Sequence, residues 1–297
     1  MKRIKPRHIL NVVPFLIIAA ALLALIFYPR KSVSAEEKRI VEVWNVDTFE
    51  GGKGSRTSFL SACARRVEKK HGGVYYFVAS YTLEGAQAAL SEGQRPDVIS
   101  FGVGLNGFEK YALSLGSSFA GNDRAAPWCR GKYVLFSLTD DFGEEGATAL
   151  SCGGNNLPVV AAALAGISGE EVESTEAYVD FLAGKYRYLL GTQRDICRFS
   201  ARGVTVYTKE LPAYCDLYQY VSILSADKKR DAERLLEELL SSQTQGMLSG
   251  LGMFPAAEKG AERTVGAFAS NETLTQLAQG ARAGEGANFL NKFLKTV

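Results

Sequence analysis

Two short polar clusters contain the side chains that are best suited to directed hydrogen bonding. Residues 191–195 (GTQRD) follow the apolar run 186–190, and residues 216–220 (DLYQY) precede the apolar run 221–224. Polar groups at the ends of buried strands are where α/β folds place their ligand sites. The two clusters therefore indicate a binding site for a polar molecule.

In the first cluster, Gln193, Arg194 and Asp195 offer directed hydrogen bonds, and Gly191 would let a ligand approach the backbone. The guanidinium of Arg194 suits a carboxylate or a pair of hydroxyl groups. The alternative is that Arg194 and Asp195 form an ordinary ion pair on the surface.

The second cluster enters a predicted strand, so its side chains alternate between two faces. Asp216, Tyr218 and Tyr220 are expected on one face and Gln219 on the other. Only one of these faces can line a binding site, and the other must pack or pair.

Further candidate ligand contacts lie at the ends of earlier predicted strands. An aromatic ring in such a place can stack on a sugar, although Trp44 could equally belong to the core. Trp128 is expected in an irregular segment before a later strand, where an exposed ring could also stack on a sugar. The candidates of this kind are Trp44, Asn45, Phe49, Glu50, Tyr81, Phe101 and Trp128.

Residue types that support catalysis are sparse. After residue 31 the only histidine is His71, at a predicted helix end among lysines, and no nucleophile motif accompanies a cysteine. No HExxH motif or pair of CxxC motifs indicates a metal site. We therefore expect a binding protein rather than an enzyme, with no cofactor and no metal.

Charge and cysteine content narrow the class of protein further. Six of the 34 basic residues lie in the first 31 positions, which leaves 28 basic against 32 acidic residues, a net charge of −4, for the rest. A mildly acidic body without a basic stripe argues against nucleic acid as a partner. The pairing of the five cysteines, Cys63, Cys129, Cys152, Cys197 and Cys215, cannot be deduced from sequence.

Residues 40–101 read as strand, helix, strand, helix and strand. This alternation over about 60 residues predicts right-handed crossovers and a parallel sheet. Ser55 or Ser58 could cap the first helix, and Asp227 is a plausible cap for the clearest later helix. The expected strands are 40–46, 74–80, 96–101 and 133–138. The first expected helix begins after Ser55, and the others are 82–92, 157–164, 175–182, 227–241 and 271–283.

The N-terminus has the pattern of a membrane anchor. Residues 1–8 are basic, residues 9–28 form an apolar run, and residues 29–39 form a charged linker. Twenty helical residues span ~30 Å, enough to cross the hydrocarbon core. The excess of positive charge before the run predicts a cytoplasmic N-terminus and an extracellular body in a single-pass protein of the cell membrane. A signal peptide cleaved after Ala35 and a buried soluble helix are the alternatives.

Several pieces in order resemble the extracellular solute-binding proteins (family 1 type) of ATP-binding-cassette (ABC) importers. They are PDVISFG, GKYVLFSL, FLAGKYRYLLGTQRD, DLYQYVSI, a long amphipathic helix and GMFPA, within residues 40–257. The resemblance implies an α/β, two-lobed, periplasmic-binding-protein-like (type II) fold after the N-terminal transmembrane helix. It places lobe 1 at residues 36–137 plus 256–297 and lobe 2 at 138–255, with the chain crossing near Leu135 and Tyr220.

The resemblance also implies a function and partners. We expect a monomeric, membrane-anchored extracellular receptor that captures a carbohydrate or a similar polar solute and delivers it to ABC permease subunits. Closure around the solute would be a hinge motion. The alternative is an anchored extracellular sensor or scaffold with the same fold and no transported ligand.

Overall fold

The structure is a computed structural model of the 297-residue chain. It describes residues 39–47, 55–116, 119, 123–143, 145–152, 157–211, 216–256 and 266–282, together with Ile18 and Leu23. The chain divides into two units, residues 1–38 and residues 39–297, and the second unit contains the elements from β1 to α9.

Strands and helices alternate strictly at the start of the second unit and are more mixed after β3. In chain order they are β1 (Arg39–Asp47), α2 (Arg56–Lys70), β2 (Val74–Thr82), α3 (Leu83–Ser91), β3 (Val98–Gly102), η1 (Glu109–Tyr111), β4 (Ala126–Ser137), β5 (Thr148–Cys152), α4 (Leu157–Leu164), β6 (Glu170–Glu173), α5 (Ser174–Leu182), β7 (Tyr188–Thr192), α6 (Asp195–Ala201), β8 (Tyr207–Glu210), β9 (Asp216–Ile223), α7 (Lys229–Leu240), α8 (Ser242–Gly246), η3 (Leu248–Leu251), β10 (Phe254–Pro255) and α9 (Asn271–Arg282).

The predicted membrane span at residues 9–28 lies outside the described residues, apart from Ile18 and Leu23, which are helical and exposed. The basic segment 1–8 and most of the linker 29–39 are outside them as well. Within the part of the chain that the structure describes, no helix combines the length and the apolar character needed to cross a membrane. The anchor therefore remains a prediction.

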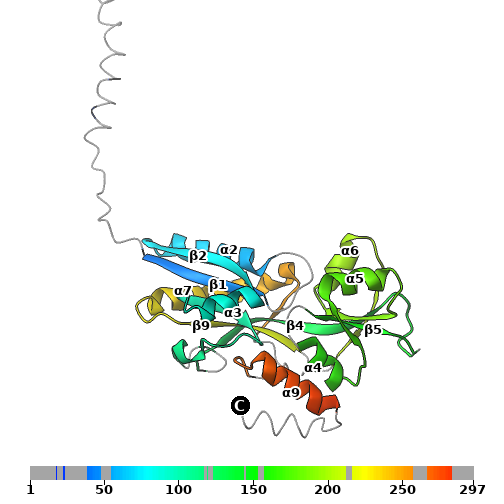
Figure 1. Ribbon diagram of the computed structural model, residues 1–297. Coiled ribbons are helices and arrows are strands. Elements are labelled where there is room, and N and C mark those ends of the chain that lie inside the picture. The colour runs from blue at the N-terminus through cyan, green and yellow to red at the C-terminus, as the bar shows by residue number, and fades with distance from the viewer. Residues whose placement is uncertain are drawn as a thin grey trace, which may run out of the picture. The chain divides into compact units, whose positions relative to one another are not determined.

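The strands follow one another in the order β2-β1-β3-β9-β4-β7-β5-β6, with β8 and β10 also paired to β4 (Figure 1). β1 pairs in parallel with both β2 and β3, which confirms the parallel arrangement predicted from the alternation of strands and helices. β9 then enters between β3 and β4 and is antiparallel to both.

β4 belongs to both parts of the sheet. Its first half, residues 126–132, pairs with β9, and its second half, residues 133–137, pairs with β7 and β8. The sequence predicted a strand only from residue 133 and an irregular segment around Trp128, which is wrong. Pro127 and Gly131 weakened the strand pattern, but β9 supplies backbone partners on one side of this half.

The lobe limits expected at residues 137/138 and 255/256 stay a prediction, since residues 39–297 form one compact unit. Two elements that the expected limits place in the second lobe contact elements that they place in the first. β9 pairs with β3, and α7 packs against α2. Sequence spacing could not reveal this return, because it gives the order of strands along the chain but not their order in the sheet.

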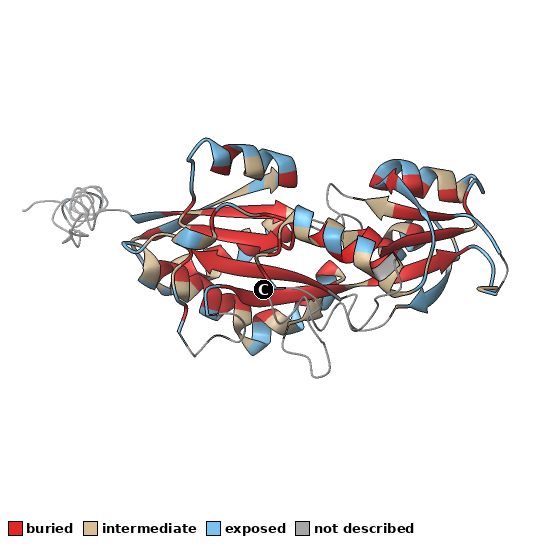
Figure 2. Ribbon diagram, turned by 60° about the horizontal axis from the view of Figure 1, so that its bottom comes forward, coloured by how far each residue is buried: buried red, intermediate tan, exposed pale blue. Residues whose placement is uncertain are grey.

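The sheet is mostly buried, and the helices that cover it expose one side (Figure 2). α2 buries Leu60, Cys63 and Val67 on the side that faces the sheet. Ser55 caps this helix by accepting a hydrogen bond from the Ser58 backbone N–H, which confirms one of the two predicted caps. Helix α9 packs against α4.

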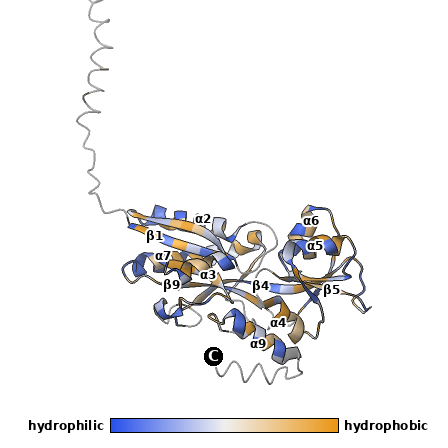
Figure 3. Cartoon of the chain, in the orientation of Figure 1, coloured by the Kyte–Doolittle hydropathy of each residue, from blue (hydrophilic) through white to orange (hydrophobic). Residues whose placement is uncertain are grey.

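α7 is the long amphipathic helix expected from the sequence: it buries Ala232, Leu235, Leu236 and Leu239, and Figure 3 shows both hydrophobic and hydrophilic residues along it. The predicted cap is wrong: α7 begins after Lys228, and Asp227 lies in the preceding turn. The Lys228 Nζ donates to the Ile40 carbonyl and, at 3.1 Å, to Asp97. These contacts hold Lys228 against β1 and against Asp97, the residue before β3. The start of α7 is therefore fixed without a side-chain cap.

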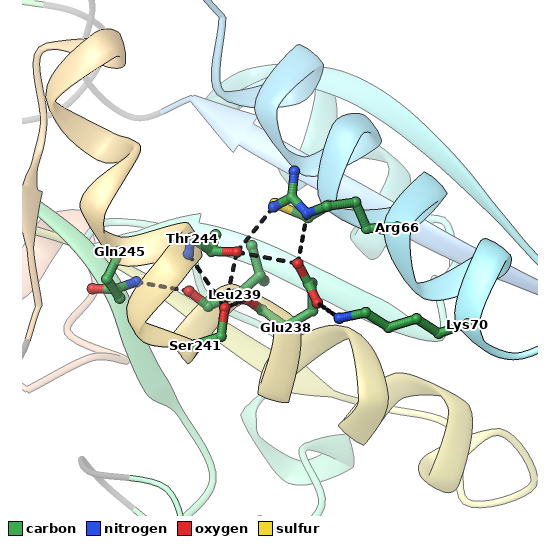
Figure 4. Close-up of polar contacts among 8 residues, drawn as sticks. Arg66, Lys70, Glu238, Leu239, Ser241, Thr244 and Gln245 are labelled. Carbon is green, nitrogen blue, oxygen red and sulfur yellow. Dashed lines mark hydrogen bonds and ion pairs between the residues drawn. The ribbon is translucent and has the colours of Figure 1, made fainter.

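A buried carboxylate fastens α2 to α7 (Figure 4). The two oxygens of Glu238 accept from Arg66 Nε and from Lys70 Nζ, each at 2.6 Å. Thr244 joins the pair, because its Oγ1 accepts from Arg66 at 2.9 Å and donates to Glu238 at 3.2 Å. Burial alone would raise the pKa of Glu238, but the hydrogen bonds from Lys70 and Arg66 outweigh it, and the pKa lies below its usual value.

Replacing Glu238 with glutamine is expected to lower the free energy of unfolding at pH 7 by roughly 1.5–3 kcal/mol, because two charged hydrogen bonds lose their acceptor charge. A carboxylate with a lowered folded-state pKa stabilises fully above the unfolded value, about 4.3, and loses that contribution as the pH falls through the folded value. The difference from wild type should therefore shrink below about pH 4. Urea unfolding over a pH series measures it.

Glu237→Gln is the matched control, since Glu237 is the exposed neighbour on the same helix. It should change stability by less than about 0.5 kcal/mol. A Glu238→Gln deficit that persists unchanged at pH 2.5 would show that the ion pairs are not its source.

Candidate functional site

A buried polar network lies where β1, β3, β4 and β9 run side by side. Ser100 of β3 donates to Asn45 Oδ1 at 3.2 Å. The Ser100 hydroxyl accepts from Trp128 Nε1 at 3.1 Å and from Gln219 Nε2 at 3.2 Å. All four residues are at most 1% exposed. Ser100 is therefore the central residue of a network that joins four strands.

The donors and acceptors of this network can be counted completely. Ser100 uses its one hydrogen and both lone pairs. Gln219 Nε2 also donates to the Val46 carbonyl at 3.1 Å, which fixes the orientation of its amide because a carbonyl can only accept. The Gln219 Oε1 is then left buried with no protein hydrogen-bond partner.

Asn45 extends the network to the N-terminus of α2. Its Nδ2 donates to Asp47 Oδ1 at 3.1 Å and to Thr57 Oγ1 at 3.0 Å. The same Asp47 oxygen accepts from Arg56 Nε at 2.6 Å. The Arg56 side chain is 2% exposed, while that of Asp47 is about one-third exposed. A charged group therefore sits at the carboxyl end of β1, the edge at which parallel α/β sheets bind ligands.

The turn after β7 reaches the same region from the other part of the sheet. Gln193 Nε2 donates to the Gly252 carbonyl at 2.8 Å, and its Oε1 accepts from the Lys132 backbone N–H at 2.6 Å. A Cβ on Gly131 would lie 2.9 Å from Gln193 Oε1, so glycine leaves room for this side chain. Gln193 therefore joins β4 to the segment before β10.

Arg194 is 4% exposed and interacts electrostatically with Arg56, Asp47 and Cys129. Burial lowers the pKa of Arg194, and the like charge of Arg56 lowers it further, while Asp47 acts in the opposite direction. Two cationic side chains, one at the start of α2 and one in the turn after β7, therefore interact with the carboxylate of Asp47.

Asp195 does not form the surface ion pair with Arg194 that was one interpretation of the sequence, since both side chains are buried. Its Oδ2 accepts from the Thr192 backbone N–H at 2.8 Å and from the Thr192 hydroxyl at 3.3 Å. A Cβ at Gly191 would lie 2.7 Å from that oxygen, so the glycine admits Asp195 rather than a ligand. Burial raises the pKa of Asp195, opposed by the Thr192 hydrogen bond and Arg198.

Among the described aromatic candidates, Trp44, Phe101 and Trp128 are buried by packing, and Tyr81 is partly exposed. The ring centroids of Trp44 and Tyr81 are 4.3 Å apart. Trp128 stacks on Phe59 with a centroid distance of 5.8 Å. Phe101 is fully buried among other aromatic rings, including Phe108. Trp128 lies in β4 rather than in an irregular segment, and its buried ring donates its N–H to Ser100, so it is not exposed for stacking on a sugar.

The second polar cluster divides between the faces of β9. Tyr218 and Tyr220 lie near each other, and Tyr220 also approaches Phe101 in the core. Gln219, on the other face, joins the polar network. Phe49 and Glu50 lie outside the described residues, as does the side chain of Asp216. The structure thus brings Asn45, Trp128, Gln193, Arg194 and Gln219 to one region.

Sequence reasoning missed Ser100 and the pair formed by Asp47 and Arg56. Ser100 could have been noticed as the polar residue directly before Phe101, the last apolar position of the predicted strand 96–101. Arg56 was not chosen as a candidate because a basic residue in the first turn of a helix normally faces solvent. The described residues include no cluster of three or more His, Cys, Asp or Glu that could hold a metal ion.

No protein-family model matches the chain, and no curated protein does. Several solved structures are similar to this chain. One is a substrate-binding domain assigned to a molybdenum ABC transporter of Clostridium difficile, at 11% identity and TM-score 0.53, covering 73% of this chain and 99% of that one. Another is the maltose-maltodextrin binding protein of Alicyclobacillus acidocaldarius, at 11% identity and TM-score 0.53, covering 86% and 100%. A third is a two-component system protein that mediates signal transduction, at 12% identity and TM-score 0.54, covering 87% and 99%.

The chain therefore has the mixed α/β fold of the periplasmic solute-binding proteins of ABC transporters, as the resemblance implied. The solutes named for these neighbours differ in kind, so the fold does not by itself select a ligand.

Replacing Ser100 with alanine is expected to destabilise the protein by about 1–3 kcal/mol, because Trp128 Nε1, Gln219 Nε2 and Asn45 Oδ1 each lose a partner in a buried place. Chemical denaturation measures the loss. Ser91→Ala is the control, since that hydroxyl lies exposed on α3 and donates only to the Gln87 carbonyl. Equal effects of the two substitutions would contradict the central role of Ser100.

Cys129 is expected to resist alkylation in the folded protein. Burial raises the pKa of its thiol to about 12, so at pH 8 only about one molecule in ten thousand carries the thiolate. Iodoacetamide labelling followed by peptide mass analysis should modify the partly exposed Cys197 first and Cys129 only after unfolding in urea. Labelling of both at one rate would mean that this neighbourhood is open to solvent.

Proposed function

We propose that this protein is an extracellular receptor that reversibly binds a small polar solute and delivers it to an ABC permease. The observation that carries the proposal is the convergence of Gln193 and Arg194, from the turn after β7, with the Asn45–Ser100–Gln219 network of the other strands. These groups come from both sides of β4, so a solute held there would contact both parts of the sheet. Rotation of the parts about β4 would then close or open the site.

Directed hydrogen bonds, rather than ring stacking, would hold the solute. Asparagine, glutamine and arginine side chains suit hydroxyl, carboxylate and phosphate groups. Trp44 and Trp128, two of the rings expected to stack on a sugar, are engaged in packing, so these rings would leave a carbohydrate to be recognised through its polar groups.

The N-terminal segment would keep the receptor at the membrane surface. Its support is the sequence pattern: basic residues 1–8, the apolar run 9–28 and the charged linker after it. The receptor would then act as an anchored monomer rather than as a freely diffusing one.

A second candidate function is an anchored sensor that binds a neighbouring membrane protein. The observation that favours it is the similar fold of a two-component system protein that mediates signal transduction. A sensor of this kind need not transport a solute, although a bound solute could still control it.

A thermal-melt screen of the full-length protein in mild detergent separates these functions. The panel contains sugars, oligosaccharides, amino acids and organic acids. A solute that binds only the folded state adds about 2.7 kcal/mol of stability at a hundredfold excess over its dissociation constant, roughly 5–10 °C in melting temperature. A shift with one class of solute is expected. A flat response from a well-folded sample would reject solute capture and leave the sensor.

A further inference from the structure

The first residues of β1 and β2 expose three large apolar side chains at the edge of the sheet (Figure 1). Ile40, Tyr75 and Phe77 are 57%, 48% and 62% exposed, and no large apolar side chain in the described part of the chain is more exposed than Phe77. Ile40 lies opposite Tyr75 in the parallel register, and Phe77 follows Tyr75 by two positions. The three side chains therefore leave the same face of the sheet as neighbours, and we call them the apolar patch.

Helix α3 is too short to cover this face from end to end. It follows β2 directly and packs on both β1 and β2. Nine helical residues extend about 14 Å, whereas the nine residues of β2 extend about 30 Å. The start of α3 lies near Tyr81, because a Cβ on Gly85 would be 3.9 Å from the tyrosine ring. The helix thus covers the carboxyl end of β2, and the apolar patch lies at the amino end.

A partly buried carboxylate marks the inner limit of the apolar patch. Glu42 lies opposite Phe77 in the register and accepts from Trp44 Nε1 at 2.8 Å. Trp44 is 1% exposed and packs against Tyr81. The same face of β1 is therefore core at Trp44 and surface at Ile40. An exposed group of adjacent apolar side chains next to the core marks a place of interaction.

The position of the apolar patch along the chain indicates which surface it can meet. Residues 29–38 separate the apolar run 9–28, the predicted membrane span, from the start of β1. Ten linking residues reach at most about 36 Å. With residues 9–28 in the membrane, the start of β1 stays within that distance of the bilayer. The tether therefore holds Ile40, the second residue of β1, at a high effective concentration near the lipid surface.

The composition of the apolar patch suits the interfacial region of a bilayer. Tyrosine is enriched there because its ring is apolar and its hydroxyl is polar, and phenylalanine and isoleucine can enter the acyl boundary. Basic side chains lie at the same end of the strands. Arg39 precedes Ile40, and Lys70 ends α2 just before β2, with side chains that are 51% and 61% exposed. Because each also pairs with a buried carboxylate, Asp231 or Glu238, their attraction to anionic lipid is modest.

We propose that Ile40, Tyr75 and Phe77 dock the body of this protein on the bilayer surface beside its anchor. The apolar side chains enter the head-group region to a shallow depth, and Glu42 stays in contact with water. This inference goes beyond the proposed function and rests on the predicted anchor. Docking would restrict the orientation of the tethered body, because the linker and the apolar patch meet at the amino end of β1.

An indole placed in the apolar patch by Phe77→Trp measures docking in the full-length protein. The protein is reconstituted into vesicles of phosphatidylcholine and phosphatidylglycerol, with and without bromine on the acyl chains. Bromine quenches indole fluorescence only at short range. After subtraction of the wild-type signal of Trp44 and Trp128, the introduced indole is expected to lose about half or more of its emission in the brominated vesicles, because an interfacial side chain reaches the acyl boundary.

Val179→Trp is the matched control. Val179 is also an exposed apolar residue, at 56%, but it lies on α5, which packs on β5, β6 and β7. Its indole should be quenched several-fold less. Thermal melting in detergent verifies that each variant folds.

A second substitution tests whether the apolar patch acts as a unit. Ile40→Ser, added to Phe77→Trp, should reduce the quenching by about twofold or more, because the neighbouring apolar contact with lipid is lost. Ile196→Ser is the control, since Ile196 is 42% exposed on α6, and it should leave the quenching unchanged.

Three results would overturn the proposal. One is equal quenching at positions 77 and 179, or none at either. Another is an emission from position 77 that bromine leaves unchanged but that shifts to the blue as protein density in the vesicles rises, which would assign the apolar patch to a second copy of this chain. The third is a protein that fails to float with the vesicles, which would reject the anchor together with the docking.

Discussion

The shared strand β4 is the constraint on which the rest of the molecule depends. Its first half pairs with β9 and its second half with β7 and β8, so one strand carries backbone hydrogen bonds for two parts of the sheet. Because the strand is continuous, the turn after β7 lies next to residues 131 and 132. Gln193 contacts Gly131 there and accepts a hydrogen bond from the Lys132 backbone N–H. Side chains that are 148 positions apart in sequence, Asn45 and Gln193, can then contribute to one region.

Burying a polar network next to this strand is favourable only if its bonds are made, because an unsatisfied buried group costs about 1–3 kcal/mol. Ser100, with every bond used, meets that condition. Gln219 Oε1 does not, and such an exception inside an otherwise satisfied network is the kind of feature that proteins retain at binding sites. The stability of the sheet and the capacity to bind therefore draw on the same side chains.

Local signals in the sequence predicted local structure well and long-range placement poorly. Ser55 as a helix cap and the parallel strands β1, β2 and β3 follow from spacing over a few residues. The return of β9 beside β3 depends on contacts across more than 100 residues, which periodicity does not encode. Among the candidate site residues, Asn45, Gln193, Arg194 and Gln219 were chosen because they are polar at strand ends, and the structure groups them. Trp128 and Asp195 were misjudged, since an aromatic ring or a carboxylate reads as exposed until its partner, Ser100 or Thr192, is known.

The contacts around β4 also bear on how a solute could enter. Gln193 holds Gly252 and Lys132 by two hydrogen bonds, and α9 packs on α4. A rotation about the middle of β4 that moved the turn after β7 away from β1 would break the Gln193 bonds and separate Arg194 from Arg56. Loss of the two Gln193 hydrogen bonds opposes such a rotation. A solute that bridged the two parts of the sheet would have to supply at least as much interaction as those hydrogen bonds provide.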